Sequence, residues 1–494
     1  MIKTCLDYHQ ETSYDRHRMG GHFLDWADQP ALFKTYEGIE RVSLPREVEL
    51  PKRRFSSLVL DRMAGRPATT IDLDTLSRLL LLANTLTAKA RTQGGDFYFR
   101  SAASAGALYP TEIYAATRGV TGLDDGLYHY GLRDHSLTPL RSGNFGASIM
   151  ESGKIAEEEV PVVTFFLTAI FYRSAWKYRA RAYRYHLLDT GHVEENLALG
   201  MKALGFSYDA SYHFDDDRVN HLLGLDGKRE AALALISLKG QDVLSMQGKR
   251  EADQLPASIF QASRVSAKEV EYPAIREMHE AGRDKRPEMG QDAGMLYALG
   301  PASREWREIE SSSRNEIADY PDCVFMRRSK RNFVRSPLRK NHAAGLLQAL
   351  CASDQEEYKE ALCPGVLIGM VEGMEQGFYL LDRNRKASGM VRQGSYLDTM
   401  AHICLDQAWL ANAGVHFLFL ANLDLVDRSW GPRGYRYAMM VAGRAGQRLY
   451  VASTAMGLGC CGIGAFYDGE ARELLGLNEN SRLLYLVAVG VVKR

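Results

Sequence analysis

The strongest constraint on this chain is an internal repeat. Residues 191–225 and residues 443–477 align without a gap: both begin with glycine, continue as an apolar helical pattern and close on Leu-Leu-Gly-Leu. Tyr-Arg-Tyr stands just upstream of each copy, at residues 183–185 and 435–437. Two copies this far apart are typical of a duplicated domain, since solenoid repeats recur at short, regular periods.

The two copies differ at one important place. Residues 460–464 of the second copy read Cys-Cys-Gly-Ile-Gly, whereas residues 208–212 of the first read Tyr-Asp-Ala-Ser-Tyr. Glycine lets a backbone lie close against a ligand, so only the second copy keeps that property. The asymmetry predicts two related halves that share one working site.

Length and charge narrow the class of protein. A chain of 494 residues suits two domains better than one core. Lys+Arg and Asp+Glu both number 61, so no overall charge favours nucleic acid or an anionic membrane. The seven cysteines form no CxxC motif, and the N-terminus lacks the apolar core of a signal peptide. We therefore expect a cytoplasmic protein without a nucleic-acid or membrane partner.

The order of sequence patterns predicts the domain organisation. The chain divides into a polar arm, a first domain, a charged linker with short helices and a second domain, at residues 1–55, 56–240, 241–317 and 318–494. Helical and strand-like patterns are mixed in each domain without regular βαβ alternation, which predicts an α+β fold.

We next consider whether the sequence contains a metal site or one of the known nucleotide-binding or catalytic motifs. His9, His17 and His22 lie in the arm, but no cysteine or carboxylate completes a tightly spaced ligand set, so we predict a packed arm and no metal site. No GxGxxG follows a strand, and no GxxxxGK[ST], HExxH or GxSxG occurs. Dinucleotide folds, P-loops, zincins and serine hydrolases therefore lack their signals.

A basic cluster precedes the first helical pattern of the second domain. Residues 327–331 read Arg-Arg-Ser-Lys-Arg, which places four cations and a hydroxyl together. Forked arginine hydrogen bonds and a serine hydroxyl suit a phosphomonoester, and a solvated surface run is the alternative interpretation. The matching residues 62–66 of the first domain have lost the serine and the middle cations.

A loop of small residues occurs only in the first domain. Residues 101–106 read Ser-Ala-Ala-Ser-Ala-Gly, so their backbone can approach a flat ligand and their hydroxyls can donate. The alternative is a tight turn between a helix and a strand. The second domain has unrelated residues, 351–365, at the corresponding place.

Lys177 and Tyr178 follow an apolar, strand-like run in the first domain. A lysine and a tyrosine side by side suit the role of acid, base or charge stabiliser when burial shifts their pKa. An aromatic lid beside a surface lysine is the alternative. By our alignment, residues 430–432, Trp-Gly-Pro, stand opposite residues 176–178, so the pair is lost in the second domain.

Together these motifs resemble a tandem member of the nitroreductase superfamily, in its SagB-type dehydrogenase or azoline-oxidase branch. The resemblance is carried by SAGALYPTEIY, GLYHY, WKYRARAYRYHLLDTGHVEENL and LLGLDG in the first half and by RRSKRNF and GLGCCGIGAF in the second. It covers residues 56–238 and 318–494. It implies two domains, each with a central mixed or antiparallel sheet flanked by helices, fused into a pseudo-dimer that binds FMN.

The resemblance also implies one composite FMN site with parts from both halves, whereas the reciprocal site is degenerate. Lys177 and Tyr178 inherit the catalytic role. The phosphate cluster and the glycine segment come from the second half, the small-residue loop comes from the first, Gln407 matches an amide near the flavin's pyrimidine edge, and Arg494 adds phosphate charge. The cofactor-binding residues are thus Arg327, Arg328, Ser329, Arg331, Ser101, Ala103, Ser104, Ala105, Gly106, Gln407, Cys461, Gly462, Ile463, Gly464 and Arg494.

The expected function is that of an FMN-dependent dehydrogenase or oxidase, in which hydride passes from a C–H next to a heteroatom to the flavin N5. One alternative is NAD(P)H-dependent reduction of nitro, quinone or enone compounds. Another is a flavin-poor scaffold that binds a peptide or a partner enzyme. The substrate is a small molecule or a peptide, oxygen or NAD(P)H is a candidate co-substrate, and the chain is a monomeric pseudo-dimer or a homodimer of it.

Overall fold

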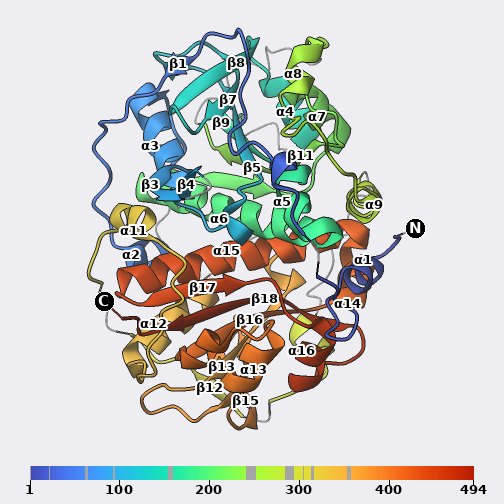
Figure 1. The fold of residues 1–494 in the computed structure, drawn as a ribbon. Coiled ribbons are helices and arrows are strands. Elements are labelled where there is room, and N and C mark those ends of the chain that lie inside the picture. The colour runs from blue at the N-terminus through green and yellow to red at the C-terminus, as the bar shows by residue number, and fades with distance from the viewer. Residues whose placement is uncertain are drawn as a thin grey trace. The chain divides into compact units, whose positions relative to one another are not determined.

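The computed structural model describes residues 2–21, 23–61, 65–92, 95–153, 160–240, 252–283, 294–303, 305–312, 316–352 and 358–493. The chain divides into two compact units (Figure 1). The N-terminal unit comprises Phe23–Pro51 and Met63–Arg276, and the C-terminal unit comprises Met1–His22, Lys52–Arg62 and Glu277–Arg494.

The N-terminal unit is built on a seven-stranded sheet with the order β1-β8-β7-β5-β9-β11-β10, in which every neighbouring pair is antiparallel. Its strands are β1 (Val42–Ser43), β5 (Thr111–Thr117), β7 (Gly126–Gly131), β8 (Ser136–Ser142), β9 (Val163–Ile170), β10 (Tyr208–Ser211) and β11 (Glu230–Leu238). Two small sheets are formed by β2 (Ile71–Asp72) with β6 (Val120–Thr121) and by β3 (Leu86–Thr92) with β4 (Gly95–Arg100). The helices are η1 (Trp26–Asp28), α3 (Leu73–Ala83), η2 (Ala105–Ala107), α4 (Gly146–Gly153), α5 (Phe171–Tyr178), η3 (Arg179–Arg181), α6 (Ala182–Ala203), α7 (Asp216–Leu223) and α8 (Ala257–Gln261), and α9 (Pro273–Ala281) crosses into the other unit.

The C-terminal unit repeats this plan, with the antiparallel order β12-β15-β14-β13-β16-β18-β17. Its strands are β12 (Trp306–Glu308), β13 (Cys363–Ile368), β14 (Gly377–Asp382), β15 (Ala387–Gln393), β16 (Val415–Asn422), β17 (Gly459–Ile463) and β18 (Ser481–Gly490). Its helices are α1 (Cys5–Glu11), α2 (Phe55–Val59), α10 (Met295–Ala298), α11 (Tyr320–Met326), α12 (Lys340–Cys351), η4 (Lys359–Ala361), α13 (Leu397–Ile403), η5 (Ala408–Asn412), α14 (Leu423–Trp430), η6 (Gly431–Arg433), α15 (Gly434–Ala455) and α16 (Asp468–Leu474).

Local sequence explains where the helices begin and which face they bury. The Asp72 carboxylate accepts the Thr75 N–H at 2.8 Å and so caps the N-terminus of α3. Leu76, Leu79 and Leu80 of α3 recur at helical spacing and are fully buried. Strands β9 and β11 are buried at every residue, as expected for strands in the middle of a sheet whose two faces are covered.

The structure confirms the α+β fold and the duplication. Strands β9 and β16, helices α5 and α14, and helices α6 and α15 begin 252 positions apart, at Val163 and Val415, Phe171 and Leu423, and Ala182 and Gly434. This register corrects one pairing from the sequence: Trp430 ends α14 as Tyr178 ends α5, so Ser429 stands opposite Lys177. The alignment of Trp430 with Trp176 was wrong because it matched two tryptophans across a two-residue shift. The loss of the Lys-Tyr pair is unaffected.

The segments expected to form an arm and a linker each supply an outer strand. Strand β1 pairs with β8 in the N-terminal unit, and β12 pairs with β15 in the C-terminal unit. Residues 1–22 belong to the C-terminal unit, where the buried His9 ring lies 3.0 Å from the Tyr435 hydroxyl and 3.1 Å from the Asp468 carboxylate.

Two findings concern a metal site and a membrane-spanning helix. Within the described ranges, no three His, Cys, Asp or Glu side chains are grouped so that they could hold a metal ion, and His22 lies outside those ranges. Of the helices that the structure describes, none combines the length and the apolar character that crossing a membrane requires.

Candidate functional site

In the C-terminal unit, Tyr450 connects the basic cluster to the glycine segment. Tyr450 lies on α15, and its hydroxyl is 2.8 Å from Ser329 Oγ and accepts the Gly462 N–H at 2.7 Å. The Arg327 guanidinium lies 5.3 Å from the centre of the Tyr450 ring. The backbone adds a further link, since Lys330 N–H donates to the Cys460 carbonyl at 2.9 Å. The structure therefore brings together two motifs that are 130 residues apart in the sequence.

The polar residues around Tyr450 differ in how far they are buried. Arg327 is buried, whereas Ser329 and Arg331 are exposed. Burial raises the pKa of the Cys461 thiol, and the nearby Arg331 and Arg327 guanidinium groups partly oppose that rise. Burial likewise raises the pKa of Tyr450 well above its ordinary value, so its phenol stays neutral at physiological pH. Neutral phenol, serine hydroxyl and two guanidinium groups form a donor set that fits a phosphate.

Two parts of the predicted cofactor site differ from what a ligand-facing cluster would show. Arg328 Nη1 donates to the carbonyls of Phe325 and Arg327 at 2.9 and 2.7 Å, so its side chain turns back to the end of α11. Cys461, Gly462 and Ile463 lie in strand β17, and Gly464 follows it, so most of the glycine segment is an edge strand of the sheet.

Gly462 has a packing reason to be glycine. A β-carbon at this position would lie 1.7 Å from the Tyr485 hydroxyl oxygen of β18. An added β-carbon would force the Tyr485 side chain to move, so the neighbouring strand favours glycine here, whether or not a ligand also approaches it.

Gln407 and Arg494 are not joined to this cluster by the described contacts. Gln407 lies between α13 and η5, and its side-chain amide donates to the Cys404 carbonyl at 2.7 Å. Leu405 and Asp406 just before it adopt positive φ angles of 57° and 56°. Arg494 lies outside the described residues.

In the N-terminal unit, the small-residue loop is held by hydrogen bonds to the protein. Ser101 is buried, and its hydroxyl accepts the Thr85 N–H at 3.1 Å; Ala103 is also buried. The Ser104 hydroxyl donates to Asp189 Oδ2 at 2.5 Å and accepts the Tyr109 N–H at 2.9 Å. The Ala105 N–H donates to Asp189 Oδ1 at 3.2 Å.

The same loop lies against the Lys-Tyr pair. A β-carbon at Gly106 would lie 2.7 Å from the Tyr178 hydroxyl oxygen and 3.3 Å from Lys177 Nζ. Gly106, Ala107 and Tyr109 have φ angles of 64°, 54° and 48°, in the left-handed region that non-glycine residues rarely adopt, whereas Leu108 between them has a φ of −91°. Such strain is retained where surrounding contacts fix the backbone, and it is common at functional sites. The structure thus brings together the loop and the predicted catalytic pair.

The pair itself is partly buried at the end of α5. Lys177 Nζ lies 5.4 Å from the centre of the Tyr178 ring, and that ring lies 4.5 Å from the ring of Tyr185 on α6. Tyr178 also packs against a buried cluster that includes Leu108 and Trp176. A phenol and an ammonium group in this setting are suited to hold or transfer a proton.

Sequence reasoning missed Tyr450 and Asp189. Tyr450 had no signal of its own, because a tyrosine in an apolar helix is usually a core residue. Asp189 had a weak one: it is an acidic residue within the apolar and aromatic stretch that precedes Gly191. A carboxylate in such a position needs partners, and the small-residue loop provides them.

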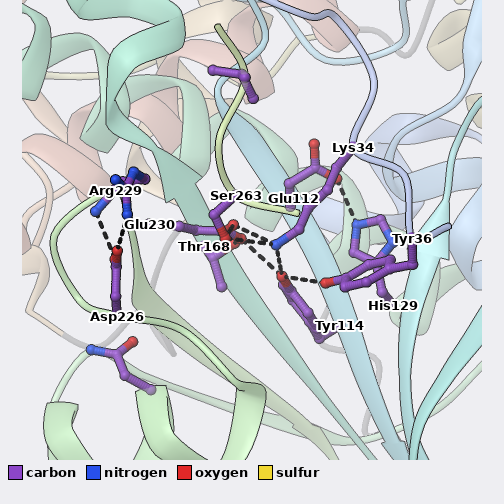
Figure 2. Close-up of polar contacts among 12 residues, drawn as sticks. Lys34, Tyr36, Glu112, Tyr114, His129, Thr168, Asp226, Arg229, Glu230 and Ser263 are labelled. Carbon is purple, nitrogen blue, oxygen red and sulfur yellow. Dashed lines mark hydrogen bonds and ion pairs between the residues drawn. The ribbon is translucent and has the colours of Figure 1, made fainter. Parts of the chain in front are cut away.

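In a second polar cluster of the N-terminal unit, Lys34 contacts polar side chains of the central sheet (Figure 2). Lys34 Nζ donates to Glu230 Oε2 at 2.6 Å, to the Tyr114 hydroxyl at 2.6 Å and to Ser263 Oγ at 3.1 Å. Thr168 also donates to Glu230, at 2.6 Å. Both charged groups are fully buried, so this cluster fixes residues 31–36 on the sheet.

Comparison with known proteins identifies the family. The nitroreductase family model matches residues 66–240 and 369–491. MJ1384, a nitroreductase-like protein of Methanocaldococcus jannaschii, is 31% identical over 186 residues, which are 36% of this chain and 93% of that protein. The trifolitoxin-processing protein TfxB of Rhizobium leguminosarum is 25% identical over 239 residues, 46% of this chain and 64% of TfxB.

One solved structure matches the whole chain. It is a nitroreductase-like protein from Anabaena variabilis, 26% identical, with a TM-score of 0.79 over 100% of both chains. The two segments matched by the family model fall one in each compact unit. This chain therefore belongs to the nitroreductase family, as a tandem of two such halves.

Proposed function

We propose that this protein is an FMN-dependent oxidoreductase with one flavin site, to which the C-terminal unit contributes the phosphate contacts and the N-terminal unit the small-residue loop and the Lys-Tyr pair. The observation that carries the proposal is the set of contacts around Tyr450, called the Tyr450 hub below. It gathers Arg327, Ser329 and Gly462, residues that the resemblance assigns to FMN on sequence alone.

The residues fit the group they would hold. Arg327, Arg331 and the Ser329 hydroxyl offer charge-assisted hydrogen bonds to a phosphate. When bound, FMN supplies a hydride acceptor at N5 and a route for two electrons to oxygen or another acceptor. Lys177, as the neutral amine, or Tyr178, as the phenolate, would remove the proton that the substrate loses as its C–H carbon forms a double bond to the neighbouring heteroatom; in its protonated form the same group would instead steady the charge there.

The branch of the family is part of the proposal. The likeness to TfxB, which is named for trifolitoxin processing, supports a SagB-type dehydrogenase acting on a peptide. A second candidate is NAD(P)H-dependent reduction of nitro, quinone or enone compounds. It is favoured by the nitroreductase-like character of MJ1384 and of the Anabaena variabilis protein. The third candidate is a flavin-poor scaffold for a peptide or a partner enzyme.

Absorbance spectroscopy of the chain purified with added FMN tests the proposal. We expect flavin bands and, after denaturation, one FMN per chain. Two per chain contradict the single site, and none supports the scaffold. Anaerobic mixing with NAD(P)H separates the two enzymes: rapid bleaching by NAD(P)H alone supports the reductase, whereas bleaching only by an oxidisable C–H substrate supports the dehydrogenase.

A further inference from the structure

Asp189 is a buried carboxylate on α6 whose hydrogen bonds go to the small-residue loop. Its side chain accepts the Ser104 O–H at 2.5 Å and the Ala105 N–H at 3.2 Å. Burial raises its pKa to about 7, although both hydrogen bonds oppose the rise. Burying a carboxylate costs free energy of folding. We therefore look for a role of Asp189 other than stabilising the fold.

The Ser104 hydroxyl is fully used by the protein. A serine hydroxyl has one proton to donate, and Ser104 gives it to Asp189. One lone pair accepts the Tyr109 N–H at 2.9 Å. While Asp189 is ionised, Ser104 therefore has no proton left for a ligand and acts on the loop itself.

The loop that Asp189 holds is the one in contact with the Lys-Tyr pair. Ser104 and Ala105 immediately precede Gly106, whose Cα carries the hydrogen that faces Tyr178 and Lys177 in place of a side chain. Any shift of the loop toward α5 is blocked by Tyr178, and any shift away from α6 breaks the bonds to Asp189. Contacts on two sides thus hold the backbone around Gly106.

The repeat offers an internal comparison. Asp189 is the eighth residue of α6, and the eighth residue of α15 is Val441, which is fully buried. The C-terminal unit carries Ser429 and Trp430 opposite Lys177 and Tyr178. Residues 358–362 before its β13 read Tyr-Lys-Glu-Ala-Leu, without a Ser-Ala-Gly sequence. The carboxylate is thus present in the copy that has the loop and the pair, and absent from the copy that lacks them.

We propose that Asp189 is the positioning residue of the site: it holds the Ser104–Gly106 backbone at a set distance from Tyr178 and Lys177, and Ser104 acts through it and not as a donor to the ligand. This inference deepens the proposed function and rests on it only for the identity of the ligand that the loop faces.

Hydrogen exchange of the ligand-free chain, followed by mass spectrometry over residues 101–110, tests the positioning role directly. In Asp189→Asn one loop donor meets an amide N–H₂ where it met a carboxylate oxygen. We expect loop amides to exchange about ten to a hundred times faster than in the parent chain, the effect of losing a hydrogen bond to a charged group. Ser104→Ala has the same effect, Ser104→Thr restores protection, and the double variant is no worse than Asp189→Asn, because the two residues act as one.

The matched control is Asp72→Asn, a carboxylate-to-amide change at the N-cap of α3 in the same unit. It should leave the loop unchanged, since asparagine caps helices well. Circular dichroism and the unfolding midpoint show whether each variant folds. If Asp189→Asn does not fold, the comparison of Ser104→Ala with Ser104→Thr decides the question alone. Loop exchange equal to that of the parent chain in folded Asp189→Asn or Ser104→Ala overturns the proposal.

Titration with FMN, read from the absorption shift of the flavin, gives the second measurement. We expect Asp189→Asn and Ser104→Ala to weaken binding by about tenfold or more and Ser104→Thr to retain the parent spectrum. Weakened binding by Ser104→Ala without faster loop exchange would mean that Ser104 donates to the flavin, against the proposal. If the parent chain binds no FMN, the proposed function fails, and the exchange experiment still decides the role of Asp189.

Discussion

Helices α6 and α15 have the same length and the same place in the fold of their units, yet each keeps a different polar anchor. At the eighth position α6 has Asp189 and α15 has Val441; at the seventeenth, α6 has Ala198 and α15 has Tyr450. Asp189 holds the small-residue loop, and Tyr450 holds the basic cluster. Each of these two polar contacts is thus present in one copy and absent from the other. The two helices share their length and their place in the unit but differ in the polar contact that each makes.

The strands beside these helices also differ between the two units in their packing. Strand pairing places Ala234 opposite Leu167 and Tyr485 opposite Phe419, so Tyr485 is the counterpart of Ala234. Gly462 in the edge strand β17 is the residue whose added β-carbon would meet Tyr485, and Ala210 in β10 stands at the corresponding place of the other unit; strand register pairs these two residues with Val487 and Ile236, two positions farther along. At the two positions one unit has two alanines, and the other has a glycine and a tyrosine. Gly462 leaves the space that the Tyr485 side chain occupies, so the two residue types depend on each other.

The largest effect is expected from Gly462→Ala. The new methyl group would meet the Tyr485 hydroxyl, so the free energy of unfolding should fall by about 3 kcal/mol. Combining Gly462→Ala with Tyr485→Ala recreates the alanine pair of the other unit and should cost less than the sum of the two single changes. Chemical denaturation measures all three. Gly469→Ala, where nothing lies within 4 Å, is the control and should not destabilise the protein. Strict additivity would show that the two sites do not interact.

Removal of an exposed arginine of the basic cluster tests the proposed difference between the two units next. Arg331→Ala should weaken FMN binding about ten- to a hundredfold, because a charge-assisted hydrogen bond to phosphate is lost. Arg66, its counterpart in the N-terminal unit, provides the matched control, since Arg66→Ala should leave FMN affinity unchanged. Fluorescence titration of FMN measures both. Equal losses in the two variants would argue for two working sites.

Tyr450→Phe should have a smaller effect. It removes the hydroxyl that accepts the Gly462 N–H and meets Ser329, so we expect about 1 kcal/mol lower stability and about fivefold weaker FMN binding. Tyr379→Phe, which loses a single bond to the Glu375 carbonyl in the same unit, is the control for stability and should not affect FMN. Unchanged FMN affinity in Tyr450→Phe would remove the hub from the site.

The smallest effect is the pH dependence that Asp189 contributes. Its folded-state pKa of about 7 lies above the usual value of an aspartate, so the folded state holds the proton more tightly than the unfolded state. This contribution to stability is fully present below about pH 4 and is lost as pH rises through 7. Between about pH 6 and 8 the loss amounts to about 1 kcal/mol.

Asp189→Asn should abolish that fall, which urea unfolding at several pH values detects. Asp72 has a lowered pKa because of its bonds to Thr75, so Asp72→Asn removes a contribution of the opposite sign. A pH profile of Asp189→Asn that coincides with that of the parent chain would mean that Asp189 does not titrate near neutrality.

The duplicated α+β fold could be predicted from the sequence, because the gapless repeat and the loss of glycines in one copy are visible without a structure. The hub at Tyr450 could not, since nothing in the sequence tells which buried aromatic residue approaches Ser329. The direction of the Ser104 proton was equally hidden, because Asp189 is 85 positions away. The pairing of Trp430 with Trp176 failed for a different reason: it matched identical residues and departed from the 252-residue offset of the repeat, which both the starts and the ends of α5 and α14 follow.

The buried pair of Lys34 and Glu230 also limits how this sequence can drift over time. Replacing either residue alone leaves the other as an isolated charge in the interior, a change that usually costs several kcal/mol. Replacing both by apolar residues is tolerable, but Tyr114, Thr168 and Ser263 would then lose their acceptor as well. Positions 34 and 230, nearly 200 residues apart, are therefore expected to be inherited as one unit, and a change at one should be found only together with a change at the other.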